Sequence, residues 1–491
     1  MDVQSVIACN NRSSKTSSHK EAQVMTAVPT SSSLLLACVL IFSACSLPSS
    51  SVGSQAVSVA SLFPSSLCSS SSSDNAVNNR KSTLSVIHRF GPCNRGSSSK
   101  DRQNHAQLLR QDDERVSSIQ SKLSGIAGDQ SLASSNVRIP AKSGSTFAIG
   151  NYVVTIGLGN PKKDLNVLFD TGSDLTWTQC RPCAGFCYNQ TDQVFDPSQS
   201  SSYANVSCSS TTCSQIRSGT SAAPGCAGSA CVYGVKYGDG SFTVGLFATE
   251  RLTLSPAEVI ENFQFGCGQN NRGLFGRVAG LIGLGRDRIS LVEQTASKYG
   301  RYFSYCLPSL SSSLGHLSFG NSGGSSAFTP MITLSDPSFY GINLVGISVG
   351  GNKLSIPQTI FSNAGTVIDS GTTITRLPQT AYKALQAAFR QGMKNYTMVP
   401  AVSPFDTCYD FSKYDEVSIP KVMFTFGGGL NVDLDPTGIL YVLSRAQVCL
   451  AFAGNADDRS VGIYGNTQQK TFEVTYDVAG GRIGFGPNGC Q

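Results

Sequence analysis

The chain has 491 residues, 40% apolar and only 14% charged, and glycine is abundant at 49 positions. That length exceeds one ordinary core, and the composition favours a β-rich protein with many turns over a helical bundle. The net charge of +6 comes mostly from residues 1–138, which hold 13 basic and 8 acidic side chains. The remainder is nearly neutral, whereas a nucleic-acid groove needs clustered Lys and Arg, so we expect no nucleic-acid partner.

The first apolar run, residues 34–45, is too short for a stable membrane span, which needs roughly 20 residues. It fits the hydrophobic part of a secretory signal, with Arg12, Lys15 and Lys20 before it. We therefore assign residues 1–53 to a signal or targeting segment and expect a secreted, extracellular or vacuolar protein. A chloroplast transit peptide is the alternative, because the first 70 residues are rich in Ser and poor in acidic residues.

Residues 46–80 are Ser-rich and of low complexity, so we expect them to bury no core. Apolar residues at helical spacing then predict a helix over residues 102–123. A helix ahead of a β-rich body indicates a propeptide over residues 54–138, and a solvated linker helix is the alternative. We call residues 1–138 the leader.

From Tyr152 onward, short apolar runs alternate with glycine turns, which indicates closely spaced strands. A Ser- and Gly-rich stretch at residues 320–326 is the expected boundary between two lobes, 139–326 and 327–491.

Twelve of the 17 cysteines lie after residue 138, an even number that favours disulfides in an oxidising compartment. The competing interpretation is zinc, since Cys180-x-x-Cys183 resembles half a ligand set. However, His316 is the one histidine in this part of the sequence, and no second pair of this spacing follows. We therefore expect neither a metal nor another cofactor.

One short phrase occurs twice in the body. An apolar strand runs into Asp170-Thr-Gly-Ser and again into Asp369-Ser-Gly-Thr, and the two aspartates are 199 residues apart. Each copy has a downstream companion of two apolar residues followed by glycine, at residues 281–283 and 463–465. Such a companion lets a buried strand pass close to the aspartate loop. The repeat predicts a duplicated lobe, whereas a single copy would equally fit an aspartate that caps a turn.

Two facing carboxyl groups can share one proton, because both do not readily ionise at close range. The ionised one can accept a proton from water while the protonated one donates to a carbonyl. The residues that follow each aspartate suit supporting roles: glycines for the turn and their N–H groups, and hydroxyls to cross-link the loops or to orient the carboxylates. These supporting residues are Thr171, Gly172, Ser173, Ser370, Gly371 and Thr372.

These residues resemble the pepsin-like aspartic peptidase family, and within it the plant nepenthesin-like branch, over about residues 150–490. The resemblance implies an aspartic endopeptidase made as a zymogen, with an all-β fold of two related β-barrel-like lobes and the active site in the cleft between them. It implies that Asp170 and Asp369 are catalytic, that Tyr237 belongs to a substrate-binding flap, and that Trp177 is its hydrogen-bonding partner. From the residues alone, Tyr237 could equally flank a turn and Trp177 could fill the core.

The same resemblance implies a cysteine-rich insertion in the first lobe, although spacing alone leaves its connectivity open. The implied bridges are Cys180–Cys183, Cys187–Cys267, Cys208–Cys231, Cys213–Cys226, Cys306–Cys490 and Cys408–Cys449.

A Ser-His-Asp hydrolase needs a histidine base, and His316 has no nucleophile motif beside it. A catalytically silent binding or inhibitor protein on the same fold, and a plastid nucleoid protease with DNA affinity, remain alternatives. We expect a monomer that acts on protein or peptide substrates. Three sequons predict glycosylation in the secretory pathway, at Asn189, Asn205 and Asn395.

Overall fold

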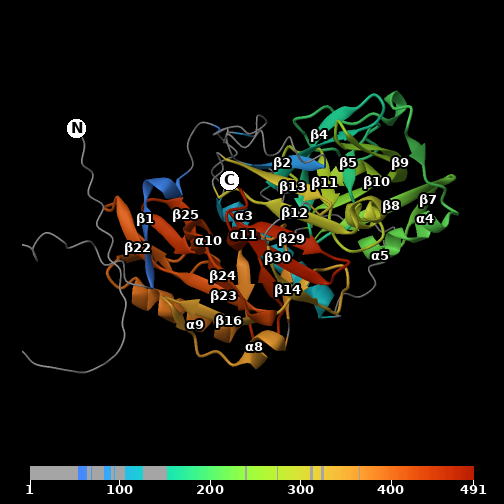
Figure 1. Cartoon of the computed structure of the whole chain (residues 1–491). Helices are drawn as coiled ribbons and strands as arrows, with labels where there is room; N and C mark the ends of the chain where they lie inside the picture. The colour runs from blue at the N-terminus through green and yellow to red at the C-terminus, as the bar shows by residue number, and fades with distance from the viewer. Residues whose placement is uncertain are drawn as a thin grey trace, which may run out of the picture. The chain divides into compact units, whose positions relative to one another are not determined.

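The computed structural model describes residues 53–63, 68, 82–89, 93, 105–124 and 152–490, except 238–239, 274, 310–312, 322–325 and 364 (Figure 1). Strands make up 43% of it and helices 20%, arranged as two β-rich lobes, which confirms the expected fold class. The predicted signal run at residues 34–45 and the expected end of the leader at residues 138–139 lie outside the described residues.

The amino-terminal lobe is built on the antiparallel pair β3 (Tyr152–Leu158) and β4 (Lys163–Asp170) and on the long hairpin of β9 (Phe242–Ser255) and β10 (Glu258–Arg272). Alternate residues of β9 are buried, as expected for a strand with one face on the core. The other elements of this lobe are β5 (Trp177–Gln179), η3 (Pro197–Gln199), β6 (Ala204–Asn205), α4 (Thr211–Ser214), α5 (Ile216–Thr220), β7 (Gly225–Ala227), β8 (Ala230–Lys236), β11 (Gly280–Gly283), α6 (Leu291–Gln294) and α7 (Ala296–Tyr299).

The carboxy-terminal lobe contains two four-stranded sheets in the orders β17-β16-β23-β24 and β20-β21-β26-β25. Its longest helix, α9 (Gln379–Gly392), begins after Pro378 and buries one apolar face that includes Leu385 and Phe389. The other elements are β15 (Gly341–Ile342), β16 (Leu344–Val349), β17 (Asn352–Lys353), α8 (Gln358–Ser362), β18 (Thr366–Ile368), β19 (Thr375–Leu377), β20 (Met398–Val399), β21 (Cys408–Tyr409), β22 (Glu416–Pro420), β23 (Val422–Phe426), η4 (Gly427–Gly429), β24 (Leu430–Asp433), α10 (Pro436–Ile439), β25 (Leu440–Ser444), β26 (Gln447–Leu450), β27 (Phe452–Gly454), β28 (Gly462–Tyr464) and α11 (Asn466–Gln469).

A further sheet connects the lobes. It runs in the order β13-β12-β29-β30-β14 and consists of β12 (Tyr302–Cys306), β13 (Leu314–Phe319), β14 (Ala327–Ile332), β29 (Glu473–Asp477) and β30 (Arg482–Gly486). All of these neighbours are antiparallel, and the three inner strands, β12, β29 and β30, each pair with a neighbour on both sides.

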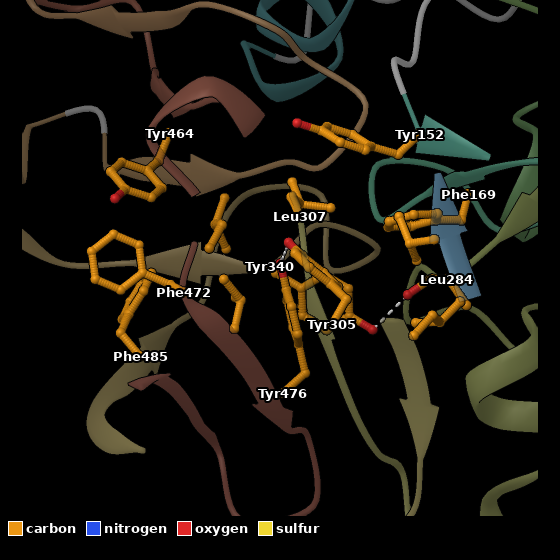
Figure 2. Close-up of a cluster of buried hydrophobic side chains, with 14 of the residues drawn as sticks. Tyr152, Phe169, Leu284, Tyr305, Leu307, Tyr340, Tyr464, Phe472, Tyr476 and Phe485 are labelled. Carbon is orange, nitrogen blue, oxygen red and sulfur yellow. Dashed lines mark hydrogen bonds between the residues drawn. The ribbon is translucent and has the colours of Figure 1, made fainter. Parts of the chain in front are cut away.

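Aromatic side chains of this sheet and of both lobes belong to one buried cluster (Figure 2). Phe303 stacks on Tyr476 with ring centroids 4.4 Å apart, and the Tyr305 hydroxyl lies 3.0 Å from the Tyr476 hydroxyl. The Tyr340 hydroxyl donates to the Leu284 carbonyl oxygen at 2.7 Å, which ties the carboxy-terminal lobe to the aspartate-loop region of the other lobe. Burial of these rings and their paired hydroxyls therefore fixes one lobe against the other.

The leader contributes two strands to the body (Figure 1). Strand β1 (Ser54–Ser58) pairs with β22, and β2 (Thr83–His88) lies between β13 and β3. The expectation that residues 46–80 bury no core is wrong, because Val57, Val59 and Leu62 in and after β1 are buried. The helix η1 (Ala60–Leu62) follows β1, and the predicted leader helix is present as α3 (His105–Leu123). The serine-rich composition made the short alternation of apolar residues in β1 hard to recognise. Its partner strand, β22, lies far along the sequence in the carboxy-terminal lobe.

Four of the six expected disulfide pairings are wrong: the structure pairs Cys180 with Cys267, Cys183 with Cys187, Cys208 with Cys226 and Cys213 with Cys231. Burial explains the difference. In each mispaired set the two buried cysteines bond to each other, as Cys180 does to Cys267 and Cys213 to Cys231, and the two more accessible cysteines form the second bridge. The other two bridges are the expected ones, Cys306–Cys490 and Cys408–Cys449, and the leader adds Cys68–Cys93.

Candidate active site

The two aspartates of the repeat stand at the ends of equivalent strands in the two lobes. Asp170 is the last residue of β4, and Asp369 directly follows β18. Both are buried, with 2% and 0% of their surface exposed. Each strand pairs in parallel with its predicted companion, β4 with β11 and β18 with β28.

The companion glycines are needed where these strands meet the aspartate loops. A Cβ atom on Gly283 would clash with the Asp174 carbonyl oxygen, and one on Gly465 would lie 2.9 Å from the Thr373 carbonyl oxygen. The glycine of each apolar-apolar-Gly phrase therefore permits the close backbone contact that holds the loop in place.

The two aspartate loops are cross-linked by a reciprocal pair of hydrogen bonds. The Thr171 N–H donates to the Ser370 hydroxyl oxygen at 3.1 Å, and the Ser370 N–H donates to the Thr171 hydroxyl oxygen at 2.9 Å. These are the side-chain bonds that the residue types predicted. They fix the two lobes at the base of the site.

Each carboxylate accepts two further hydrogen bonds from its own loop. At Asp170 the donors are the Gly172 N–H at 3.0 Å and the Ser173 hydroxyl at 2.7 Å. At Asp369 they are the corresponding Gly371 N–H at 3.0 Å and Thr372 hydroxyl at 2.5 Å. The glycines also face the opposite aspartate: a Cβ atom on Gly172 would lie 2.8 Å from Asp369 Oδ1. The loops are thus nearly symmetric and bring the two carboxylates together.

A leader residue, Arg115 of α3, contacts both carboxylates. Its Nη2 atom donates to Asp170 Oδ1 at 2.5 Å and to Asp369 Oδ1 at 2.9 Å, and its Nε atom donates to Asp369 Oδ2 at 2.9 Å. A single nitrogen therefore reaches one oxygen of each aspartate. A water molecule in its place could reach the same two oxygens.

The two carboxyl groups differ in their electrostatics. Burial raises the pKa of both, but at Asp170 the attraction and hydrogen bonds of Arg115 outweigh burial and lower the pKa. At Asp369 burial outweighs Arg115, and the negative charge of Asp170 raises the pKa further. Burial opposes the charge on Arg115, yet the two carboxylates raise its pKa, so the guanidinium stays protonated. Asp170 is therefore the favoured ionised member and Asp369 the favoured protonated one.

Helix α3 is also held by a second charged contact in the carboxy-terminal lobe. Asp112 accepts from the N–H groups of Thr373 at 2.5 Å and Ile374 at 3.1 Å, and it lies 3.3 Å from Nη2 of Arg376. Asp113 lies 2.5 Å from the same nitrogen.

Apolar residues of α3 pack on either side of these charges. Leu109 joins a cluster with Ile374 and Phe405, and Ile119 joins another with Phe339 and Ile463. The helix thus covers the aspartate pair and apolar surface next to it.

The predicted flap residues meet as expected. The Trp177 Nε1–H donates to the Tyr237 hydroxyl oxygen at 2.8 Å, and the indole is fully buried with Phe275 edge-on at 4.8 Å. Tyr237 follows β8, and its N–H donates to the Ser241 carbonyl oxygen at 2.7 Å across the turn to β9. Asp170, Tyr237 and Arg115 are among the residues that line one pocket.

Sequence reasoning missed Arg115, Asp112 and Arg376. The available signal was the helix itself: Asp112 and Arg115 lie on the same face as Leu109, Val116 and Ile119, where charged residues are unexpected. Charges on the buried face of a helix need partners, and here those partners come from the two lobes.

The remaining predicted sites lie apart from the aspartates or on the surface. His316 lies in β13, and its Nε2 atom is 2.7 Å from Glu473 Oε2, so it is a strand residue with a carboxylate partner. The sequon residues Asn189, Asn205 and Asn395 are exposed. Within the described ranges, no cluster of side chains suited to a metal ion is found, and no helix is long and apolar enough to cross a membrane.

Comparisons with known proteins agree with this geometry. Family models described as the N-terminal and C-terminal parts of xylanase inhibitors match residues 152–321 and 339–487. An aspartyl protease family protein of Arabidopsis thaliana is 53% identical over 443 residues, which cover 89% of this chain and 93% of that protein. The aspartic proteinase nepenthesin-2 of Nepenthes gracilis is 36% identical, over 74% and 84% of the two chains. The crystal structure of edgp matches with a TM-score of 0.56 at 23% identity, covering 71% of this chain and 93% of that one, which supports the fold alone.

Proposed function

The chain belongs to the plant family of pepsin-like aspartic proteases, and from this premise we propose that Asp170 and Asp369 are the catalytic pair of an aspartic endopeptidase. The observation that carries the proposal is the convergence of the two buried carboxylates on one atom, Nη2 of Arg115. Each carboxylate comes from one copy of a repeated loop and has the same set of supporting donors.

The chemistry follows from two carboxyl groups that share one proton, which is the established pattern of aspartic protease pairs. The ionised carboxylate takes a proton from a water molecule as the water oxygen attacks the peptide carbonyl carbon. The protonated carboxyl gives its proton to the carbonyl oxygen. Return of protons through the pair to the leaving nitrogen then breaks the C–N bond. Tyr237, held by Trp177, is suited to cover a bound peptide from the flap side.

The arrangement of the leader supports its role as an inhibitory propeptide. Arg115 occupies the place of the attacking water and pairs with both carboxylates, so the described form is an inactive precursor. Strands β1 and β2, which both precede α3 along the chain, anchor the leader to the body. Cleavage between α3 and β3, followed by departure of α3, would open the site. We accordingly retain residues 54–138 as the propeptide, residues 1–53 as the signal segment, and lobes at 139–326 and 327–491.

The disulfides support passage through the secretory pathway. Seven bridges are present in the described chain, and such density is typical of proteins matured in oxidising compartments. The exposed sequons at Asn189, Asn205 and Asn395 are accessible for glycosylation there. We therefore propose a secreted or vacuolar enzyme.

A digestion assay tests the proposed function. Leader-free protein should fragment acid-denatured globin at acid pH, and pepstatin should block the fragmentation. A silent binding protein on the same fold would leave the globin intact at every acid pH while still folding cooperatively, and that result would overturn the proposal.

A further inference from the structure

The carboxylate of Asp112 occupies a cradle in the wall of the carboxy-terminal lobe. The cradle consists of two backbone N–H groups, from Thr373 and Ile374, and the guanidinium of Arg376. Asp112 and Arg376 are 1% and 4% exposed. Burial raises the pKa of the Asp112 carboxyl, against the opposing attraction of Arg376 and the two N–H groups. These three donor groups are arranged as a carboxylate requires.

Arg376 belongs to the body, but its charged partners belong to the leader. Nη1 donates to the Ile374 carbonyl oxygen at 2.9 Å, which fixes the guanidinium against its own strand. In the described part of the chain, its ion pairs are with Asp112 and Asp113 of α3. Departure of α3 therefore uncovers a pre-positioned guanidinium and removes the two negative charges that neutralise it.

The cradle lies close to the catalytic pair. Thr373 directly follows Thr372, whose hydroxyl donates to Asp369. On α3, Asp112 precedes Arg115 by three residues, which corresponds to about 4.5 Å along a helix. An extended peptide advances about 3.3 Å per residue, so this spacing corresponds to one or two residues from the bond at the aspartates.

We propose that Arg376, with the N–H groups of Thr373 and Ile374, forms a substrate subsite that selects an acidic side chain one or two residues from the cleaved bond. The inference rests on the proposed function and specifies the substrate class of that site. In the precursor, Asp112 fills the subsite as a substrate side chain would. A neutral side chain there leaves the guanidinium without a charged partner, whereas Asp or Glu restores the pairing.

Matched peptides test the subsite. Leader-free protein is given a fluorogenic peptide series in which a single Glu or Gln occupies each position near the cleaved bond in turn. At one position, kcat/KM for the Glu peptide should exceed that for the Gln peptide by about 10- to 100-fold, the range expected for a hydrogen-bonded charged pair. Arg376→Gln should bring this ratio close to one, and Arg376→Lys should preserve part of it because the charge remains.

The pH dependence separates substrate recognition from a structural role of Arg376. The raised pKa of Asp112 comes from burial under α3, which favours the protonated carboxyl. Leader-free protein lacks that cover, so Arg376 and the two N–H groups should favour the ionised side chain. A free glutamate side chain ionises near pH 4.3, so the Glu-to-Gln ratio should rise as pH increases through about 4 to 5. The ratio should not change with pH in Arg376→Gln. Even if that variant fails to fold, the ratio and its pH dependence in the unmodified protein still decide the question.

Two results would overturn the inference. Equal cleavage of Glu and Gln peptides at every position would show that Arg376 serves only to hold the leader, while cleavage itself would leave the proposed function standing. Absence of cleavage of the whole series would remove the proposed function, and the subsite inference with it.

Discussion

Replacement of Arg115 by methionine should release the active site before the leader is cut. The side chain is 10% exposed and donates to both aspartates, which are themselves buried. Removing one partner of a buried charged pair typically costs about 3–5 kcal/mol, because the remaining charges stay desolvated. The variant should therefore favour undocking of α3 by roughly 100-fold to several thousand-fold relative to the natural chain.

The assay measures peptide hydrolysis by the uncut precursor. Initial rates with a fluorogenic peptide are recorded in mild acid, at the highest pH where leader-free protein is active. Gel analysis of the same samples follows the intact chain, so that activity before cleavage is distinguished from activity after it. The matched control is Arg110→Gln, which removes an exposed arginine from the same helix.

Arg115→Met precursor should be active while still intact, and the Arg110→Gln precursor should stay as inactive as the natural one. The reasoning is refuted if the intact Arg115→Met precursor shows no activity above the natural precursor. It is also refuted if both variants gain equal activity, because the effect would then arise from general loosening of α3.

Three further predictions concern the flap, the leader strand and the aspartate loop. Tyr237→Phe removes the acceptor of the buried Trp177 N–H, so thermal denaturation should show a loss of about 1–3 kcal/mol, and kcat/KM should fall; an unchanged melting temperature would contradict this. Burial lowers the pKa of His88 in β2 to about 3, so docking of the leader should weaken as pH falls below the ordinary value of 6.5. His88 as a whole is partly exposed, so solvent screens part of this effect and we expect about 1–2 kcal/mol from it. His88→Phe should slow leader loss near pH ~5, and faster loss would contradict the sign. Gly371→Ala places a methyl group against Asp170, which should reduce kcat roughly 100-fold in a protein that still folds, and full activity would argue against the close approach of the loops.

The catalytic loops were predictable because their requirements are local. Each loop needs an aspartate at a strand end, a glycine for the turn and a hydroxyl for the carboxylate. All three lie within four residues, and the residue type alone indicates each role. The companions at Gly283 and Gly465 were predictable for the same reason, since close backbone contact demands glycine. The structure has each of these features where the repeat predicted it.

The leader and the disulfides were less predictable because their partners are distant in the sequence. Strand β1 is short and Ser-rich, and only its pairing with β22 makes it a strand. Which cysteine bonds to which depends on burial in the folded lobe, as for Cys213 and Cys231. The role of Arg115 could have been inferred from its place on the apolar face of α3, but its targets depend on the docking of the helix.

Hydrolysis of denatured globin by leader-free protein carrying Asp170→Asn or Asp369→Asn tests the central claim most directly. Each substitution preserves the shape of the side chain but removes its capacity to exchange a proton with water or substrate, so each should lower kcat by at least about 1,000-fold. Asp433→Asn, on an exposed strand residue, should cleave at the natural rate. Undiminished digestion by either active-site variant would contradict the assignment of the two carboxylates as one catalytic pair.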